Sequence, residues 1–373
     1  MKILHVITGL DVGGAETVLL RLLQHQDLQE FDSEVVSLSR GGSLAGEVEK
    51  LGVPVHELGP SRNSPLGALR MRRLLLRFRP DLVQTWMYHA DFLGGLTARL
   101  ATRAPIVWGI HSGPAPPGGF KGRRWFGMKV LSRLSYRLPA RIICCSETSR
   151  SVHTDAGYSG SKMVVVPNGF VDPGPVPARA RESLLEELGL RSDVLLVGRI
   201  GRDHPQKDIG TLLDSFRRIV DPRVHLIIVG KGLSPENSHL FRRFPFLTAG
   251  RIHLLGPRSD IVALNTAFDV AVSSSSFGEA LPLVLGEAMV SATPVVSTDV
   301  GDAIQLIDDH ERVVPPRDPE ALARAIRKVL EMPIGEREEL GRRDRDRVTR
   351  LYSVERMVAR YGDVYREVLA TQS

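Results

Sequence analysis

Short apolar runs rich in β-branched residues recur along the whole chain, and segments with helical spacing separate them. The runs lie in segments 2–8, 31–39, 53–59, 81–87, 105–113, 140–147 and 162–173, and then in segments 194–216, 224–232, 251–261, 268–272 and 294–298. Strands that alternate with helices over short loops form parallel sheets covered by helices. The pattern therefore predicts an α/β fold built on doubly wound parallel sheets.

A chain of 373 residues is long for one hydrophobic core, so we expect two domains. Apolar residues make up 42% and charged residues 25%, as in ordinary folded proteins. No apolar run approaches the ~18 residues that span a bilayer, and the opening MKILHVITGL is interpreted as a strand. The two cysteines, Cys144 and Cys145, are adjacent in an apolar run, which suits neither a disulfide framework nor a zinc site and favours the cytoplasm.

Positive charge is concentrated in one part of the chain. The whole sequence carries a formal net charge of +6, whereas Ser61 to Arg141 alone contains 15 Lys and Arg residues against two acids. This region more than accounts for the total and implies an anionic partner.

Residues 273–302 carry the clearest candidate site. FDVAV (268–272) and PVVST (294–298) are typical of buried strands, and Pro282 stands where a helix would begin between them. A helix start attracts anions such as phosphate. Glu279 before it and Glu287 within it are badly placed to touch phosphate, but they can accept hydrogen bonds from hydroxyls beside it. Phosphate flanked by hydroxyls describes a nucleotide-sugar.

The segment FGEALPLVLGEAM resembles the E-x7-E signature of the retaining glycosyltransferases called glycosyltransferase family 4. The resemblance implies the GT-B fold, with two Rossmann-like doubly wound parallel-sheet domains facing a central cleft. It also implies that Glu279 contacts the transferred sugar and Glu287 the ribose of the donor. The alternative is that both are ordinary acidic residues near a helix start, but the apolar neighbours of Glu287 favour its partial burial, and a buried carboxylate needs a partner.

Other parts of the chain extend the resemblance to nearly its whole length. The GGAE segment with Gly13 and Gly14 is similar to the family's N-terminal loop that faces the donor phosphate or the acceptor. His111 matches the family's histidine that contacts the donor sugar. Polar residues also follow the strand 81–87, at the end where ligands gather in α/β sheets, and we expect acceptor contacts from Tyr88, His89 and Asp91.

The second half supplies the remaining donor contacts. Arg199 and Lys207 match the cations that hold the donor diphosphate, although the loop is about two residues longer than usual and Arg202 is an alternative to Arg199. Arg258 lies in a turn similar to the family's base-facing turn. The further residues expected to bind the donor are Gly230, Gly278, Ala280, Leu281 and Pro282.

Domain boundaries follow from the same comparison. The PNGF turn and the Pro/Ala-rich stretch 173–180 indicate the passage between domains. We predict an acceptor-binding domain at 1–172, a donor-binding domain at 173–350, and a terminal segment, 351–373, whose helix crosses back to the first domain.

Segment 114–139 mixes aromatic and basic residues after a Pro/Gly-rich start. It suits an interfacial helix on an anionic membrane, or else a basic helix whose aromatic residues pack on the domain. No nucleic-acid-binding module accompanies it, so nucleic acid is not expected as a partner.

These observations predict an enzyme that transfers a sugar with retention from a UDP- or GDP-sugar to a saccharide acceptor, which is lipid-linked or membrane-associated. Polysaccharide or lipopolysaccharide assembly on the inner face of the cell membrane fits this reaction. No cofactor or essential metal is expected, because no Asp-x-Asp metal signature lies in a suitable loop. The alternatives are a hydrolysing nucleotide-sugar epimerase of the same fold and a non-enzymatic two-lobed binding protein.

Overall fold

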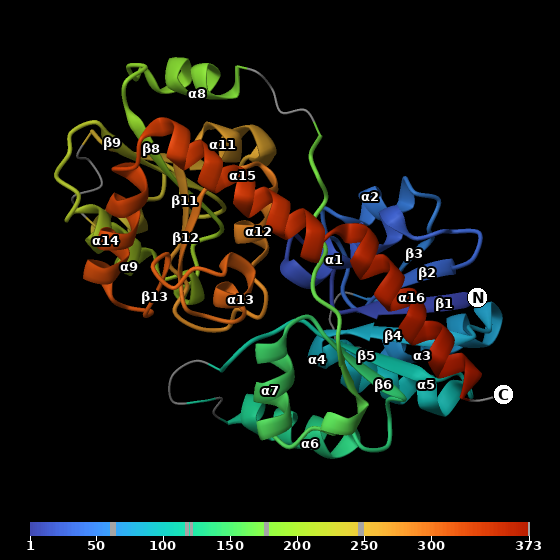
Figure 1. Ribbon diagram of the computed structural model, residues 1–373. Helices are drawn as coiled ribbons and strands as arrows, with labels where there is room; N and C mark the ends of the chain where they lie inside the picture. Colours follow the sequence, from blue (N-terminus) through green and yellow to red (C-terminus); the bar gives the residue numbers. More distant parts are fainter. Residues whose placement is uncertain (60–64, 116–118, 120–121, 175–178, 245–249, 372–373) are drawn as a thin grey trace. The chain divides into compact units, whose positions relative to one another are not determined.

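The computed structural model describes residues 1–59, 65–115, 119, 122–174, 179–244 and 250–371 (Figure 1). The chain divides into two compact units. Unit 1 comprises Met1–Gly169 together with Val354–Ser373, and unit 2 comprises Phe170–Ser353. The first boundary lies three residues before the predicted one because Phe170 packs into unit 2: its N–H donates to the carbonyl of Tyr352 at 2.8 Å, and its ring fills the space beside Gly286.

Unit 1 is built on a seven-stranded parallel sheet with the order β3-β2-β1-β4-β5-β6-β7. Each strand is one of the predicted apolar runs. Their bounds are β1 Lys2–Ile7, β2 Asp32–Ser37, β3 Val55–Glu57, β4 Leu82–Trp86, β5 Ile106–Ile110, β6 Arg141–Cys144 and β7 Met163–Val165. The central strands β1, β4 and β5 are almost wholly buried, as strands covered on both faces must be.

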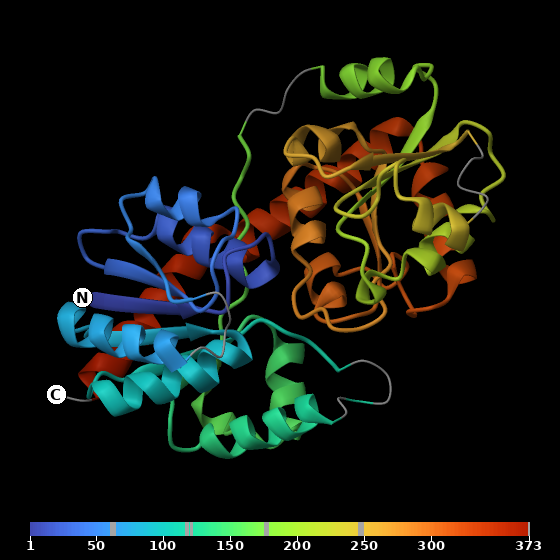
Figure 2. The ribbon, with the colours of Figure 1, turned by 180° about the vertical axis from the view of Figure 1, so that it is seen from behind.

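Helices cover both faces of this sheet (Figures 1 and 2). Helix α1 packs against α16 on one face, and α3 packs against α5 on the other, where their apolar sides form a core with the strands. The bounds are α1 Gly14–His25, α2 Ala45–Glu49, α3 Pro65–Phe78, α4 Met87–His89, the π-helical turn Ala90–Gly94, α5 Gly95–Ala101, α6 Arg123–Leu134, α7 Glu147–Asp155 and α16 Val354–Ala370.

The C-terminal helix α16 is part of unit 1. The Sδ atom of Met357 accepts the N–H of Gly169 at 3.1 Å, and Tyr365 meets the ring of Phe31 edge-on, with the centroids 6.2 Å apart. Because its buried side chains belong to the core of unit 1, this unit is assembled from both ends of the chain.

Unit 2 contains a six-stranded parallel sheet with the order β10-β9-β8-β11-β12-β13. The bounds are β8 Leu195–Ile200, β9 Val224–Val229, β10 Ile252–Gly256, β11 Val270–Ser273, β12 Val295–Thr298 and β13 Val313–Val314. Two cores, one on each face, fix the helices to it. The bounds are α8 Ala180–Leu188, the 3₁₀ turn η3 Pro205–Lys207, α9 Ile209–Phe216, α10 Ser238–Arg243, α11 Ile261–Ala267, α12 Leu283–Val290, α13 Ala303–Ile307, α14 Pro319–Leu330 and α15 Ile334–Leu351.

Both sheets are doubly wound, which confirms the predicted fold class of two Rossmann-like domains. In unit 1 the strand order reverses between β1 and β4, and in unit 2 between β8 and β11. At such a point the loops that leave the two strands diverge and open a crevice at the carboxyl ends. The candidate site residues lie mainly in these loops.

Candidate active site

Lys207 and Glu279 meet where β8 and β11 of unit 2 end. The Nζ atom of Lys207 donates to Oε1 of Glu279 at 2.7 Å, and the Ser275 hydroxyl donates to the same oxygen at 2.8 Å. Both charged side chains are largely buried. They come from loops 72 residues apart in the sequence, so the topology of the sheet brings them together.

Hydrogen bonds to backbone carbonyls hold these two loops in register. The N–H of Ser276 donates to the carbonyl of Gln206 at 2.8 Å, and the Ser274 hydroxyl donates to the carbonyl of Lys207 at 2.9 Å. The Thr298 hydroxyl, at the end of β12, donates to the carbonyl of Ser275 at 2.5 Å. The serine-rich sequence thus ties the loop after β11 to both neighbouring strand ends, and this fixes the position of Glu279.

Helix α12 begins directly after this loop. Pro282 occupies the position before the first helical residue, with φ −66° and ψ 110°, instead of the first helical position that the sequence suggested. Ala280 and Leu281 are buried and pack the loop onto the sheet. Glu287 lies one turn into the helix and is half-buried, beside Gly286, which leaves no room for a side chain against Phe170.

Arg199 is buried beneath the loop after β8, where the sequence predicted a contact with the donor diphosphate. Its side chain is 2% exposed, and its guanidinium donates to the carbonyls of Gly201 and, at 3.2 Å, Arg202. Arg199 therefore supports the loop after β8 from beneath. Arg202, the alternative that the sequence left open, is exposed on the same loop.

Two of the predicted glycines serve backbone packing. A Cβ atom on Gly230, with φ 145°, would lie 2.2 Å from the carbonyl oxygen of Gly201, so this glycine lets the loops after β8 and β9 touch. Gly278, with φ 79°, faces the side chain of Gln206.

Arg258, expected near the nucleobase, forms ion pairs with Asp260 at 2.6 Å and with Glu187 at 2.7 Å.

In unit 1, His111 follows β5 and lies in an aromatic stack. Its ring stacks on Trp86 with the centroids 5.1 Å apart, and the Tyr361 ring from α16 stacks on Trp86 at 5.8 Å. The Tyr361 hydroxyl lies 3.5 Å from Nε2 of His111. Burial lowers the pKa of His111 to about 4, against a smaller opposing effect of a hydrogen bond with Asn168, so the imidazole is neutral at physiological pH.

Asp91 is also misassigned as an acceptor contact. It is 1% exposed, and its Oδ1 atom accepts the Thr85 hydroxyl at 2.6 Å. Burial raises its pKa well above the usual range. The chain turns after β4 through Met87, with φ 71°, and then through a π-helical turn, which points Asp91 back into the core.

The other expected residues of unit 1 remain near its sheet edge. The Tyr88 hydroxyl bonds to Ser112 and, at 2.6 Å, to Nε2 of His153, and His89 is exposed. Gly13 precedes the first residue of α1, Gly14, and a Cβ on Gly13 would meet the carboxylate of Glu16, which reaches back over the helix start.

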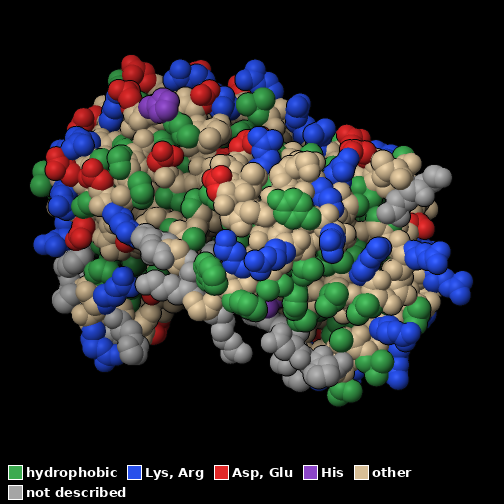
Figure 3. Space-filling model, turned by 90° about the horizontal axis from the view of Figure 1, so that it is seen from below, with side chains coloured by type: hydrophobic (Ala, Val, Ile, Leu, Met, Phe, Trp, Pro, Cys, Tyr) green, Lys and Arg blue, Asp and Glu red, His purple; other side chains and the backbone are tan. Residues whose placement is uncertain are grey.

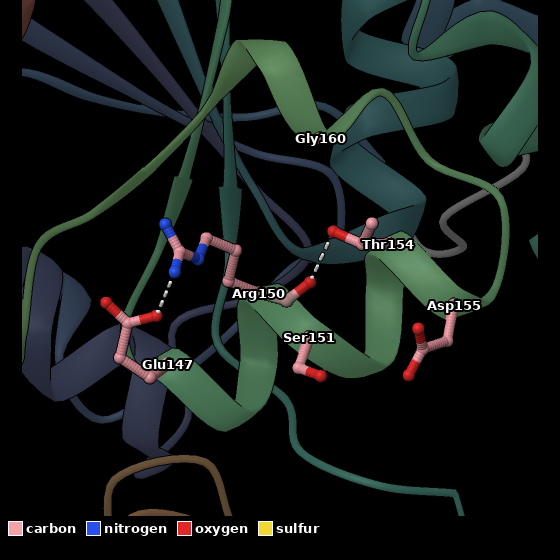
Figure 4. A pocket seen from close by; sticks show the side chains of 6 residues that line it. All are labelled: Glu147, Arg150, Ser151, Thr154, Asp155 and Gly160. Atoms are coloured by element: carbon pink, nitrogen blue, oxygen red, sulfur yellow. Dashed lines mark hydrogen bonds and ion pairs between the residues drawn. The ribbon is translucent and has the colours of Figure 1, made fainter.

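A shallow depression lies on α7, away from these residues (Figure 4). Three of its side chains interact within the helix: Arg150 pairs with Glu147 at 2.7 Å, and the Thr154 hydroxyl donates to the carbonyl of Arg150 at 2.9 Å. Pairs one turn apart are ordinary on an exposed helix. We therefore assign no function to this depression.

Segment 114–139 has both exposed and packed apolar side chains. Trp125 and Phe126 on α6 are exposed, with Lys129 over the Trp125 ring, whereas Met128 packs against the core of unit 1. Phe120 and Lys121 lie outside the described residues, and the side chains of Arg123 and Arg124 are not described.

Several residues that shape the two sites were not predicted from the sequence. Ser275, Gln206 and Gly301 hold the Glu279 loop, and Trp86 and Tyr361 hold His111. The serine run and the glycine after β12 were visible signals for the first group. Tyr361 carried no signal, because its contact depends on the return of α16.

Family models match both halves of the chain. The model described as Glycosyltransferase Family 4 matches residues 12–172, and that described as Glycosyl transferases group 1 matches residues 191–332. The phosphatidyl-myo-inositol mannosyltransferase of Mycobacterium tuberculosis is 30% identical over 277 residues, which cover 67% of this chain and 68% of that protein. The chain belongs to glycosyltransferase family 4, and it is a glycosyltransferase.

Further relatives and solved structures agree. The UDP-Gal:alpha-D-GlcNAc-diphosphoundecaprenol alpha-1,3-galactosyltransferase of Escherichia coli is 24% identical over 314 residues, 80% of each chain. The structure of Anabaena HepE in complex with UDP superposes with a TM-score of 0.85 at 23% identity, covering 98% of this chain and 100% of that one. The match confirms the GT-B fold, and these proteins give no support to the epimerase alternative.

Proposed function

We propose that this glycosyltransferase moves a sugar, with retention, from a UDP- or GDP-sugar to a hydroxyl of a lipid-linked or membrane-associated saccharide in cell-surface polysaccharide assembly. The single observation that carries the proposal is the Lys207–Glu279–Ser275 cluster at the switch point of unit 2, beside the start of α12. UDP leads GDP because HepE binds UDP and UDP-glucose and the Escherichia coli relative is named for UDP-Gal.

The chemistry places positive groups at the diphosphate and carboxylates at the hydroxyls. Lys207, Arg202 and the first N–H groups of α12 stabilise the charge that develops on the leaving diphosphate. Glu279 accepts a hydrogen bond from the transferred sugar, and Glu287 accepts one from the ribose. The bond from the anomeric carbon to the diphosphate breaks, the acceptor oxygen bonds to the same face of that carbon, and its proton passes to the diphosphate oxygen.

Unit 1 contributes the acceptor side in this proposal. Tyr88 and His89 lie near the sheet edge where acceptor contacts are expected. His111 keeps its predicted role toward the transferred sugar, because its neutral imidazole can donate or accept a hydrogen bond with a sugar hydroxyl without carrying charge. The relatives act, by their names, on a diphosphoundecaprenol-linked sugar and on phosphatidyl-myo-inositol, which supports an acceptor with a lipid anchor.

We further propose that the reaction needs no metal ion. Among the described residues, no group of three or more His, Cys, Asp and Glu side chains is arranged to hold a metal ion. Full transfer activity in excess EDTA is the expected result.

The test is a calorimetric titration of UDP, GDP and ADP into the wild type and variants. Loss of a charge-assisted hydrogen bond costs ~1.5–3 kcal/mol, so we expect Lys207→Ala and Arg202→Ala to bind the preferred nucleotide roughly 10- to 100-fold more weakly. Glu287→Ala should weaken binding as well. Lys328→Ala is the control, because Lys328 is an exposed residue of α14 paired with Glu311.

The titration either supports or contradicts the proposed donor site. Binding of one nucleotide that only the site variants weaken supports the donor site, and that nucleotide's sugars are then tested with membrane extracts for a lipid-soluble product. No binding of any of the three nucleotides to the folded wild type contradicts the proposal.

A further inference from the structure

Helix α3 exposes a stripe of leucines with arginines beside it. Leu66, Leu69 and Leu76 are 65%, 44% and 46% exposed. At 3.6 residues per turn, they and Arg73 fall within about 80° of the helix circumference. The opposite side is buried through Met71, Leu74, Leu75 and Phe78 and packs into the core of unit 1, so the exposed leucines lie outside that core.

The arginines of α3 border the leucine stripe on both sides. Arg72 lies on one border, and Arg70 and Arg77 lie on the other. Arg70 donates to the carbonyl of Leu58 at 2.9 Å, which leans it toward the body of unit 1. An apolar stripe between two rows of cations is the pattern of a helix that lies in a membrane interface, since long basic side chains reach the headgroups from a submerged helix.

Helix α5 packs beside α3 and continues the surface (Figure 2). Phe92, Leu96 and Leu100 are spaced four residues apart and are exposed, Leu100 by 77%. Arg99 and Arg103 flank them and are exposed too. We call the exposed residues of α3 and of segment 92–103 the α3–α5 surface.

The α3–α5 surface is positively charged, which favours an anionic partner. Neither α3 nor α5 contains an acidic residue, and the one acid of segment 90–94, Asp91, is buried. Figure 3 shows one face of the molecule, on which green hydrophobic and blue basic side chains lie intermixed. A bilayer with anionic headgroups complements both properties at once, because it accepts apolar side chains and attracts cations.

We propose that the α3–α5 surface docks unit 1 onto an anionic lipid bilayer, with the leucines and Phe92 in the interface and the arginines at the headgroups. The proposal rests on the proposed function for its purpose, since an acceptor with a lipid anchor is presented at that bilayer. It also assigns docking to α3 and α5, whereas the sequence pointed to segment 114–139. No helix in the described ranges is long and apolar enough to cross the membrane.

The experiment is sedimentation of the full-length protein with vesicles of phosphatidylcholine alone and of phosphatidylcholine with 30% phosphatidylglycerol at 0.1 M salt. Each basic residue near an anionic surface contributes a factor of roughly five in partitioning, so Arg72→Glu with Arg73→Glu should lower binding by about 30-fold or more. Leu69→Ser with Leu76→Ser should lower it at least tenfold. Raising the salt to 1 M, where the Debye length is about 3 Å, should weaken the wild type.

Matched controls lie in unit 2. Arg342→Glu with Arg343→Glu reverses two exposed charges on α15, and Leu351→Ser changes an exposed leucine, so both should bind vesicles like the wild type. Near-ultraviolet circular dichroism of every variant reports folding, and UDP titration reports the donor site separately.

The vesicle experiment has four distinguishable outcomes. Loss of vesicle binding in the surface variants alone supports the proposal, even if no nucleotide binds and the proposed function fails. No sedimentation of the wild type with anionic vesicles overturns it. Wild-type binding that survives both surface variants also overturns it and points to α6, and a leucine-dependent dimer without vesicle binding identifies a second copy as the occupant.

Discussion

Lys207 and Glu279 neutralise each other in the absence of a donor. Their 2.7 Å ion pair is largely removed from water, so separating the charges without replacement would be costly. In the proposed reaction, a donor diphosphate would supply that replacement, because it would offer Lys207 new oxygens while the hydroxyls of the sugar occupied Glu279. The pair therefore holds both side chains in place for an anion with hydroxyls at its side, and it disfavours a bare anion that would leave the carboxylate unpaired.

Asp91 gives a prediction in which pH is the variable. An unfolded aspartate has a pKa of ~3.9, and burial raises the pKa of Asp91 in the folded chain well above that value. Between these two pKa values the folded state keeps a proton that the unfolded state has lost, so the wild type loses stability as pH rises through this window. Asp91→Asn removes the ionisation, and its free energy of unfolding relative to the wild type should be higher at pH 7.5 than at pH 4 by about 1 kcal/mol or more.

Urea unfolding at the two pH values measures this difference. Asp363→Asn is the control, because Asp363 is an exposed residue of α16 paired with Arg366 and should respond equally at both. If Asp91→Asn follows the wild type in parallel at both pH values, Asp91 is not a buried acid with a raised pKa.

The same residue illustrates what the sequence does not contain. Tyr88, His89 and Asp91 follow a strand end, where polar residues commonly meet ligands, and this made all three candidates. The positive φ of Met87 and the π-helical turn rotate Asp91 inward, and neither feature has a recognisable sequence pattern. Arg199 and Arg202 differ likewise, since burial of the first depends on a loop that folds back over it.

At the scale of elements, the strands were predictable because buried parallel strands read as continuous apolar runs. Strand β13 has only two residues, and α13 has five, so neither carries a periodic signal and neither was predicted. The E-x7-E segment marked the loop before α12, but not what fixes that loop. The contacts that fix the loop come from β12, which follows α12 in the sequence, and from η3, a short 3₁₀ turn more than 60 residues earlier.

Gly301 is the element-scale test of this loop. A Cβ on this residue, with φ 68°, would lie 2.3 Å from the carbonyl oxygen of Ala280 and 2.6 Å from that of Glu279. Gly301→Ala must therefore push the loop away from the end of β12, in addition to the ~1–2 kcal/mol of left-handed strain. We expect a loss of ~1–3 kcal/mol in unfolding free energy and a drop in nucleotide affinity of roughly tenfold or more.

Gly335→Ala is its matched control. Gly335 lies exposed in α15 with open space around its Cα, so alanine there should raise stability by ~0.5–1 kcal/mol and leave nucleotide binding unchanged. Wild-type affinity in Gly301→Ala would show that the position of Glu279 does not depend on this contact.

At the scale of the whole molecule, each unit takes its fold from its own alternation of strands and helices, and this is why two domains were readable from the chain. The exact boundary between the units was harder to predict. The PNGF turn indicates the segment in which the chain passes from one unit to the other, but only the burial of Phe170 in unit 2 identifies the boundary residue. The contribution of the last helix to unit 1 came from the resemblance to the family. The sequence of α16 indicates that one side of the helix is apolar, but it does not indicate which unit that side packs against.

Removal of that helix gives the prediction for the whole chain. Met357, Tyr361 and Tyr365 of α16 are buried in contacts with Gly169, Trp86 and Phe31, all in unit 1. At ~1.5–3 kcal/mol for each buried side chain, these three contribute ~5–9 kcal/mol, which is comparable to the ~5–15 kcal/mol that stabilises a whole domain. A chain that ends at Ser353 should therefore lose the fold of unit 1, while unit 2, whose cores lie within Phe170–Ser353, keeps its own. Hydrogen exchange measured by mass spectrometry distinguishes the units, because peptides from β1 to β7 should exchange fully while those from β8 to β12 stay protected. Unchanged protection of β1 and β4 in the shortened chain would mean that the N-terminal segment folds alone and that α16 only covers it.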